Sequence, residues 1–221
     1  MEVQEAVQKR RSIRHFLDKP VPEEDVNKII SDAIWAPSWG NSQPWEIIAV
    51  TGSPLDQFKK ENKETIMKGE PPNADITFPA EWPEKFQERL NGIERSLFDA
   101  LSIDAEDFEG GLNYYGDMFS IFDAPVFLII TVDKKISLEY AMIDMGSIMQ
   151  NICLLAHDRG LGTCLLAASI SYPKISRKLF SIPDTKNIVC GIALGWPDSQ
   201  APENNFERSR EGVNEFLRWV R

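Results

Sequence analysis

The fold is decided by residues 124–160, APVFLIITVDKKISLEYAMIDMGSIMQNICLLAHDRG. Its first part, Val126 to Val132, is almost continuously apolar, which is typical of a strand that is buried on both faces of a sheet. After a short polar turn, apolar residues recur at helical spacing from Leu138 to Arg159, and Gly160 is suited to end that helix. The stretch therefore predicts a buried strand followed by a long helix.

Further elements are predicted on both sides of this stretch. Strands are expected at 45–51, 163–168 and 187–194, and helices at 2–9, 22–35 and 173–180. Pro22 is expected at the first helical position, because acidic residues follow it and favour the positive end of a helix dipole. The last residues, 213–221, are expected to form a short helix or an extended arm.

The charge of the chain is concentrated in one segment. The 221 residues include 24 basic and 34 acidic side chains, a formal net charge of -10, which argues against nucleic acid or an anionic membrane as the main partner. Residues 54–123 hold 16 acids and 7 bases, so they carry -9 of this total. Helical patterns occur there at 56–68, 84–101 and 104–110. We expect a single domain, residues 1–221, with a helical acidic insertion at about 54–123.

Nothing in the sequence suggests a membrane or secreted protein. The longest apolar run, residues 124–132, is about half the ~20 residues of a membrane helix. The amino terminus is acidic before any apolar stretch and lacks the pattern of a signal peptide. Cys153, Cys164 and Cys190 form an odd set in apolar surroundings, which predicts buried, reduced thiols. A cytoplasmic protein is expected.

An arginine-rich segment, RRSIRHF at 10–16, follows the first predicted helix. Arg10, Arg11 and Arg14 place three guanidinium groups close together, and Ser12 adds a neutral donor. Planar guanidinium groups are suited to phosphate oxygens, so the segment is a candidate phosphate site. The alternative is a solvated basic end of a helix, where cations favour the negative end of the dipole.

A second arginine pair lies near the carboxyl terminus, in ERSR at 207–210. In an extended segment Arg208 and Arg210 would point to the same side, because side chains alternate. The alternative is that both are surface arginines paired with Glu207 and Glu211.

The loop APSWGNSQPW, residues 36–45, is a candidate for binding a planar heterocycle. Ser38, Asn41 and Gln43 supply hydrogen-bond donors and acceptors, and Trp39 or Trp45 could stack on a ring. Prolines at both ends limit the freedom of the loop and so lower the cost of ordering it. A plain capped loop is the alternative.

Residues 160–169, GLGTCLLAAS, combine a glycine turn with small residues that allow a ligand close to the backbone. A helix cap followed by a buried strand explains the same residues. The glycines follow a helix instead of a strand, so this is not a dinucleotide-binding fingerprint.

Several standard chemistries find no support in the sequence. There is no Walker A or G-x-S-x-G motif, and His15 and His157 are the only histidines, which makes a zinc site a poor interpretation. Asp144, in the long helix, is interpreted as a structural or interface carboxylate. Phosphate donors and a heterocycle-binding loop without a nucleophile or metal indicate that a bound cofactor carries the chemistry.

Taken together, these motifs resemble the flavin-dependent nitroreductase family. The resemblance covers residues 8–53 and 124–212 and rests on six motifs in the order typical of the family. They are RRSIRHF, APSWGNSQPW, the D-x-G…Q-N of residues 144–151, GLGTC at 160–164, IALGWP at 192–197 and the pair Arg208 and Arg210.

The resemblance implies an α+β nitroreductase-like fold, with a central, mostly antiparallel β-sheet flanked by helices, and an interlocked homodimer with two FMN sites at its interface. It assigns the FMN phosphate and ribityl chain to Arg10, Ser12, Arg208 and Arg210, and the ribityl chain and ring edge to Arg11 and Arg14. It assigns the ring to Pro37, Ser38, Trp39, Asn41 and Gln43 of the partner subunit, and to the backbone of Leu165, Leu166, Ala167 and Ala168. The family's flavin-contacting Asn and Lys in the middle of the chain have no clear counterpart, and Asn113 is the nearest candidate.

The implied function is an FMN-dependent oxidoreductase that takes hydride from NAD(P)H and reduces a small acceptor, such as a nitroaromatic or a quinone, by a ping-pong mechanism. No side chain is expected to act as a covalent nucleophile, because the flavin carries the chemistry, and no metal is expected. One alternative is a different flavin reaction on the same fold, such as dehalogenation, azoline oxidation or flavin cleavage. Another is a non-enzymatic flavin-binding protein.

Overall fold

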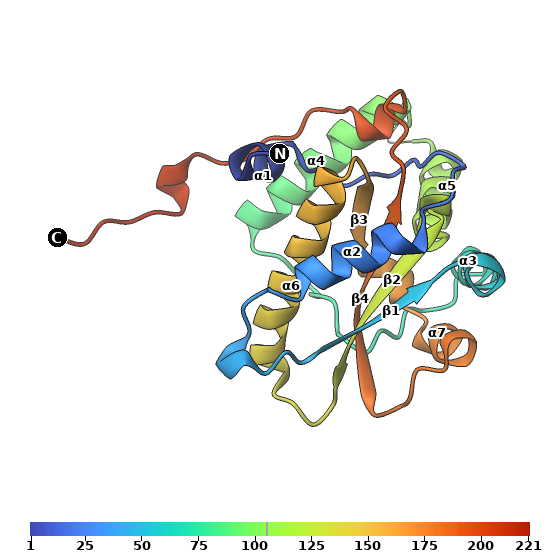
Figure 1. The fold of residues 1–221 in the computed structure, drawn as a ribbon. Coiled ribbons are helices and arrows are strands. Elements are labelled where there is room, and N and C mark those ends of the chain that lie inside the picture. The colour runs from blue at the N-terminus through green and yellow to red at the C-terminus, as the bar shows by residue number, and fades with distance from the viewer. Residues whose placement is uncertain (105) are drawn as a thin grey trace.

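A four-stranded sheet lies at the centre of the structure, a computed structural model that describes residues 1–104 and 106–221 (Figure 1). The strands are β1 (Trp45–Val50), β2 (Val126–Asp133), β3 (Gly162–Leu166) and β4 (Lys186–Gly195). Their order is β1-β2-β4-β3, and each neighbouring pair is antiparallel. The expected α+β class, with an antiparallel sheet flanked by helices, is confirmed.

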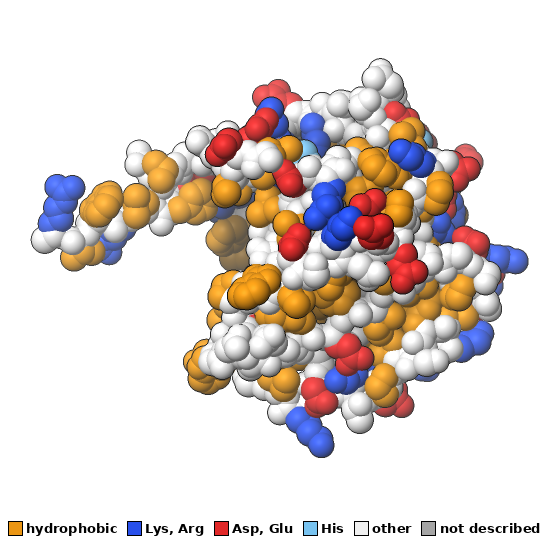
Figure 2. Space-filling model, in the orientation of Figure 1, with side chains coloured by type: hydrophobic (Ala, Val, Ile, Leu, Met, Phe, Trp, Pro, Cys, Tyr) orange, Lys and Arg blue, Asp and Glu red, His pale blue; other side chains and the backbone are white. Residues whose placement is uncertain are grey.

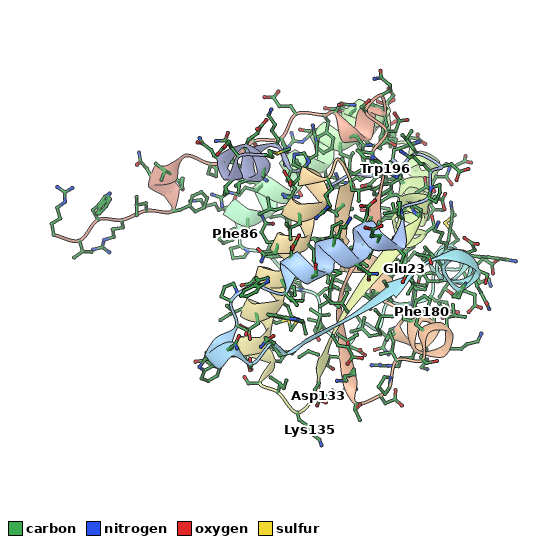
Figure 3. All side chains as sticks on the ribbon, in the orientation of Figure 1. Glu23, Phe86, Asp133, Lys135, Phe180 and Trp196 are labelled. Carbon is green, nitrogen blue, oxygen red and sulfur yellow. The ribbon has the colours of Figure 1, made fainter. Side chains whose placement is uncertain are left out.

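Helices cover both faces of this sheet. They are α1 (Val3–Lys9), α2 (Glu23–Ala33), α3 (Gly52–Met67), α4 (Glu84–Leu101), α5 (Phe108–Phe119), α6 (Leu138–Asp158) and α7 (Pro173–Phe180). Helices α2 and α6 pack on one face, while α3, α5 and α7 pack on the other (Figure 1). On that second face Phe180, labelled in Figure 3, lies 5.3 Å from Phe58 between ring centroids.

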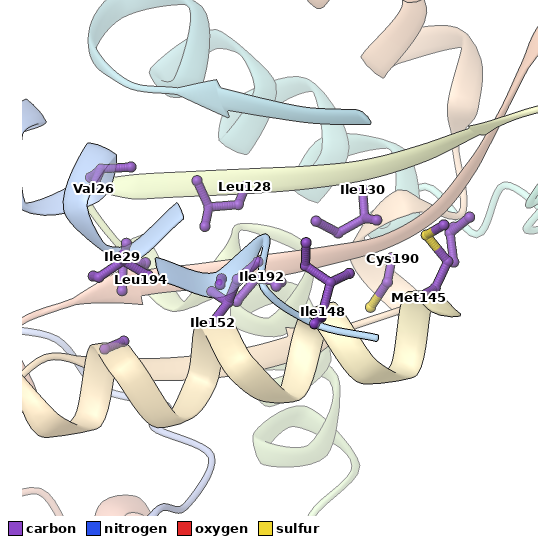
Figure 4. Close-up of a cluster of buried hydrophobic side chains, with 14 of the residues drawn as sticks. Val26, Ile29, Leu128, Ile130, Met145, Ile148, Ile152, Cys190, Ile192 and Leu194 are labelled. Carbon is purple, nitrogen blue, oxygen red and sulfur yellow. The ribbon is translucent and has the colours of Figure 1, made fainter. Parts of the chain in front are cut away.

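Strand β2 contributes to both halves of the core, as its apolar sequence predicts. Leu128 and Ile130 point toward α6, where Ile148 and Ile152 meet them (Figure 4). The alternate residues of the strand, Phe127 and Ile129, are fully buried on the opposite face. Burial of β2 on both faces is therefore confirmed. Strand β4 pairs with β2, and the edge strand β3 pairs with β4.

Most predicted helix bounds agree with the structure to within a few residues, and two positions need correction. Pro22 is the N-cap of α2 and not its first helical residue. The helix predicted at 104–110 is wrong: α5 begins only at Phe108 and continues to Phe119. The Asp107 carboxylate accepts a hydrogen bond from the Gly110 N–H at 2.8 Å, so this acidic stretch caps the helix instead of forming it. Ala105, part of that prediction, lies outside the described residues.

The C-terminal arm, residues 213–221, extends away from the rest of the molecule (Figure 1). It contains one 3-10 turn, η5 (Val213–Glu215), and is otherwise irregular. Its apolar side chains are exposed, as Figure 2 shows, among them Phe216 and Trp219. The arm thus presents an apolar surface that its own chain leaves uncovered.

Two further expectations concern the environment of the chain. All three cysteines are free and buried, as predicted. In the part of the chain that the structure describes, no helix combines the length and the apolar composition needed to cross a membrane.

Candidate functional site

The arginine-rich segment lies along the outer edge of β3. The Ile13 N–H donates to the Thr163 carbonyl at 2.9 Å, and Ser12 forms a bridge with Thr163. This close approach requires Gly162, because a Cβ there would lie 2.5 Å from Cγ1 of Ile13. The contact carries Arg10, Arg11 and Arg14 to the edge of the sheet.

The IALGWP motif holds the end of the same segment. The Leu17 N–H donates to the Trp196 carbonyl at 2.8 Å, and the Trp196 indole N–H donates to the Pro20 carbonyl at 3.2 Å. Nζ of Lys19 lies 3.8 Å from the centre of the Trp196 ring, which is labelled in Figure 3. These contacts fix the chain between the arginines and α2.

The carboxyl-terminal segment returns to the arginines and binds their backbone. Arg208 donates to the carbonyls of Arg10 and Gln8, the latter at 2.7 Å. Asn204, only 3% exposed, accepts the Arg14 N–H at 2.7 Å and donates to the His15 carbonyl at 2.8 Å. The first and last parts of the chain are thus joined into one structural unit.

We call Arg10, Arg11, Arg14 and Arg208 the arginine cluster. Among the described residues, none of them forms an ion pair with a carboxylate. Burial and then Arg11 and Arg10 lower the pKa of Arg208. The buried Nε of Arg10 has no hydrogen-bond partner within the described chain. Concentrated, unneutralised charge with an unused donor is what a bound phosphate requires.

The ion pairing that the sequence suggested as an alternative for Arg208 is not what the structure has. Arg208 is not paired with Glu207 or Glu211, since Glu211 instead accepts from Nε of Arg89 at 3.2 Å. Arg210 differs from the cluster, because it is exposed and its guanidinium donates to the Ser209 carbonyl at 2.7 Å.

Strand β3 offers an open edge beside the cluster. Leu165 is 43% exposed, whereas the other residues of the strand are buried. Backbone groups alternate along a strand, so the Leu165 amide points to the same edge as the Thr163 carbonyl that binds Ile13. The strand ends at Leu166, before the predicted Ala168, which begins the 3-10 turn η3 (Ala168–Ile170). A planar ligand could approach the backbone here.

The loop at 36–45 has an unusual backbone that is fixed against α6. Asn41 and Gln43 have positive φ angles of 58° and 47°. The Gln43 N–H donates to Oγ of Ser38 at 3.0 Å, and the Trp39 N–H donates to the buried Asp144 carboxylate at 3.1 Å. Asp144 therefore has the structural role that its position in the helix suggested.

Within one chain this loop and the arginine cluster lie at opposite ends of α6. The loop contacts Asp144, whereas the cluster adjoins His157, whose pKa is lowered by burial and then by Arg10 and Arg208. The 13 residues from Asp144 to His157 span roughly 20 Å at 1.5 Å per residue. The structure brings together the site residues at 10–14, 165–168 and 208, and leaves those at 37–43 apart from them.

Three contributors to the site escaped the sequence analysis. Asn204 joins the two ends of the chain, and the Phe206 ring lies 5.4 Å from the guanidinium carbon of Arg11 and 5.7 Å from that of Arg14. Tyr114, on α5, lines a pocket of about 360 Å³ with Arg14 and Asn113. Only Phe206 had a signal, its position directly before ERSR.

The three cysteines are not activated as nucleophiles. Burial raises the pKa of Cys153 and of Cys164, and it raises the pKa of Cys190 to about 12. Since the thiolate is the reactive form, these cysteines are inert near neutral pH. The described residues contain no cluster of three or more His, Cys, Asp or Glu side chains placed to hold a metal ion.

Comparison with known proteins gives this geometry a context. The chain is 36% identical to the nitrobenzene nitroreductase of Ectopseudomonas oleovorans, over 99% of this chain and 96% of the relative. It is 31% identical to the 4-nitrobenzoate reductase of Pseudomonas putida, over 97% of this chain and 93% of the relative.

A solved structure extends the similarity to the whole fold. The FMN and NADPH-dependent nitroreductase NfnB from Sphigopyxis sp. strain HMH superposes with a TM-score of 0.95 at 27% identity, covering 100% of this chain and 99% of the other. The nitroreductase-like fold expected from the sequence is thereby confirmed. The model of the nitroreductase family matches residues 7–196. This chain belongs to the nitroreductase family.

Proposed function

We propose that this protein is an FMN-dependent oxidoreductase that uses NAD(P)H to reduce a nitroaromatic acceptor. The observation that carries the proposal is the arginine cluster, which lacks carboxylate partners among the described residues, beside the open edge of β3. Relatives named as reductases of nitrobenzene, chloronitrobenzene and 4-nitrobenzoate support the acceptor class. The similarity to the FMN and NADPH-dependent NfnB from Sphigopyxis sp. strain HMH supports the cofactor and the reductant.

The residues present fit an FMN phosphate. The orphaned Nε of Arg10 and the mutual effect of the arginines on their pKa values both call for an anion. The phosphate and ribityl chain are assigned to Arg10, Ser12, Arg208 and Arg210, the ring edge to Arg11 and Arg14, and the ring face to residues 165–168. Of these residues, Arg210 requires the largest movement of its side chain to contact the phosphate, because that side chain is exposed.

The loop residues of the proposed site require a second subunit. Pro37, Ser38, Trp39, Asn41 and Gln43 lie about 20 Å along α6 from the cluster. A homodimer in which each loop reaches the partner's arginines completes both sites. The exposed apolar arm, residues 213–221, is suited to wrap around that partner.

Bound FMN would supply the hydride chemistry between NAD(P)H and the acceptor, in the two half-reactions of a ping-pong cycle. The protein binds, orients and stabilises charge. The arginine cluster neutralises the phosphate, and the Leu165 amide is presented to the ring through the strand edge. Arg14 provides a fixed positive charge for the ring edge. Quinones are a second acceptor class suited to this chemistry.

The remaining proposals concern the whole chain. We place the protein in the cytoplasm, because its three cysteines are free and buried. We describe it as one domain whose acidic insertion, residues 54–123, shapes the acceptor pocket. Asn113 and Tyr114 reach Arg14 from this insertion, which supports that assignment.

A visible spectrum of the purified protein tests the proposed function. We expect flavin absorbance that NADH or NADPH bleaches under anaerobic conditions and that nitrobenzene restores. Arg210→Ala should weaken FMN binding by about 1.5–3 kcal/mol through loss of a charge-assisted contact. A colourless protein that fails to take up FMN would contradict the proposal.

The same experiment separates the alternatives. Flavin that is bleached by nicotinamide but not restored by nitroaromatics or quinones indicates a different flavin reaction. Bound flavin that neither nicotinamide reduces indicates a non-enzymatic flavin-binding protein.

A further inference from the structure

We propose that Asn62 is a positioning residue for the reductive half of the proposed reaction, because it fixes the turn η3 that follows β3. Through this turn it holds the backbone of residues 165–168, which is assigned to the cofactor ring, so the inference rests on the proposed function. Asn62 lies on α3, in the acidic insertion, and belongs to none of the sequence motifs that pointed to the site.

The side-chain amide of Asn62 joins three elements in the core. Asn62 is completely buried. Its Nδ2 donates to the Phe119 carbonyl, at the end of α5, at 2.7 Å and to the Ser169 carbonyl, in η3, at 2.9 Å. Because both partners are carbonyls and can only accept, the two hydrogens of Nδ2 face them and the orientation of the amide is fixed. One side chain on α3 thus holds η3 beside the end of α5.

The turn η3 passes this restraint on to the backbone assigned to the ring. Ser169 is itself completely buried, and its Oγ donates to the Leu166 carbonyl at 3.1 Å. The Ile170 N–H donates to the Ala167 carbonyl at 3.3 Å. Residues 166–170 therefore form one hydrogen-bonded unit, so a displacement of the Ser169 carbonyl also displaces Leu166 and Ala167.

The same amide acts on the acidic insertion. Helix α5, whose last residue supplies the Phe119 carbonyl, also carries Asn113, which lines the pocket of Arg14. Asn62 therefore couples the backbone assigned to the ring with the helix that we assign to the acceptor pocket.

Packing alone does not call for an amide at this position. Its Oδ1 is buried without a hydrogen-bond partner among the described residues, which costs free energy. Leu55 and Phe58, on the same face of α3, show that hydrocarbon side chains pack well in this part of the core. What the amide adds is direction, because it holds two carbonyls in fixed positions.

Hydride transfer depends steeply on the geometry of donor and acceptor, so a displacement of about 1 Å can cost a large part of the rate. The phosphate contacts of the cofactor are assigned to the arginine cluster, to which Asn62 makes no hydrogen bond. Loss of the amide should therefore slow reduction of the cofactor and leave its retention nearly unchanged.

The test compares Asn62→Leu with Leu55→Ala in the FMN-loaded protein. Leu55→Ala is the matched control, because it removes buried contacts from the same face of α3, about two turns away, and leaves both bonds of the amide in place. The rate constant for FMN reduction at saturating NADH or NADPH is measured by stopped-flow absorbance without oxygen.

For Asn62→Leu this rate constant should fall about tenfold. The affinity for FMN should change less than about threefold, because charged phosphate contacts dominate it. Leu55→Ala should lower the melting temperature but keep the rate constant within about twofold of wild type, since it leaves η3 in position.

Amide hydrogen exchange of the apoprotein gives a readout that does not depend on the cofactor. Relative to β2, Asn62→Leu should speed exchange in residues 166–171, whereas Leu55→Ala should not. Ser169→Ala is a second, milder variant, because it keeps both bonds of Asn62 and breaks only the bond from the turn to the Leu166 carbonyl. It should slow FMN reduction in the same direction.

A wild-type rate of FMN reduction in folded Asn62→Leu, or an equal loss of rate in Leu55→Ala, would overturn the inference. If Asn62→Leu does not fold, a wild-type rate in Ser169→Ala overturns it. A wild-type protein that does not bind FMN overturns the proposed function itself, and hydrogen exchange still decides whether Asn62 fixes the turn.

Discussion

Backbone carbonyls hold the arginines of this site in place. Arg208 donates to the Arg10 carbonyl, and Arg11 donates to the Phe206 carbonyl. A carbonyl fixes the direction of a guanidinium without removing its charge, so the cluster stays available for an anion.

His157 reports on the state of the cluster. Burial and then Arg10 and Arg208 lower its pKa below the usual value of about 6.5. A phosphate in the cluster offsets the two arginines, so FMN should raise the pKa of His157. The measurement is a proton NMR titration with and without FMN. The chain has only two histidines, and His157→Gln identifies the signal.

The same shift affects stability. Because the folded protein holds the His157 proton less tightly than the unfolded chain, the contribution of His157 to the free energy of unfolding is present above about pH 6.5. It is lost as the pH falls through the lower folded-state pKa.

In the NMR experiment, identical His157 titration curves with and without FMN would contradict the assignment of the cluster to the phosphate.

At this scale the sequence predicted residues that cluster locally and missed those that act at a distance. Arg10, Ser12 and Arg14 lie within five consecutive residues, so the local sequence alone shows that they are suited to binding a phosphate. Asn204 acts on a segment 190 residues away, so no local pattern marks it. Tyr114 depends on where α5 packs, which the sequence alone did not fix.

Among the elements, strong apolar periodicity made prediction reliable. Strand β2 and helix α6 were predicted almost to the residue, because burial on defined faces leaves a clear pattern. The start of helix α5 was predicted too early, because aspartate is favoured both in the first turn of a helix and at its N-cap, and Asp107 is the N-cap. The contact between segment 10–14 and β3 was not predicted, because it joins residues that are far apart in the chain.

That contact can be tested at Gly162. In Gly162→Ala the new methyl group would lie 2.5 Å from Ile13, so the segment must move away from β3. We expect a loss of about 1–3 kcal/mol in unfolding free energy and weaker FMN binding. Denaturant unfolding and an FMN titration measure the two effects.

Gly111→Ala in α5 is the control, because no atom lies within 4 Å of its added Cβ. It should stabilise the helix by up to about 1 kcal/mol and leave FMN binding unchanged. Equal FMN affinity in Gly162→Ala would show that the position of the segment does not govern the site.

For the whole molecule, the net charge of -10 is a property of one region. Residues 54–123 carry -9, while the rest of the chain is nearly neutral. This insertion borders the site, since Asn113 lines the pocket of Arg14 and Arg89 pairs with Glu211 in the carboxyl-terminal segment. The composition predicted the charge, and the structure adds its location.

An acidic border should disfavour anionic acceptors. We expect a higher kcat/KM for nitrobenzene than for 4-nitrobenzoate at low salt, with the difference shrinking as salt screens the charges. A cationic nitroaromatic should show the opposite salt dependence. Values of kcat/KM that are independent of acceptor charge at low salt would refute this role of the insertion.

The length of α6 has a consequence for inheritance as well as for chemistry. Its two ends present different halves of the proposed site, one around Asp144 and the other around His157. In the proposed homodimer, a chain defective only in its loop and a chain defective only in its arginines should therefore rescue each other in a mixed pair. Such a pair would hold one intact site and one site with both defects. Two harmful alleles of this gene could thus complement each other, and cofactor retention would depend on how much protein a cell makes.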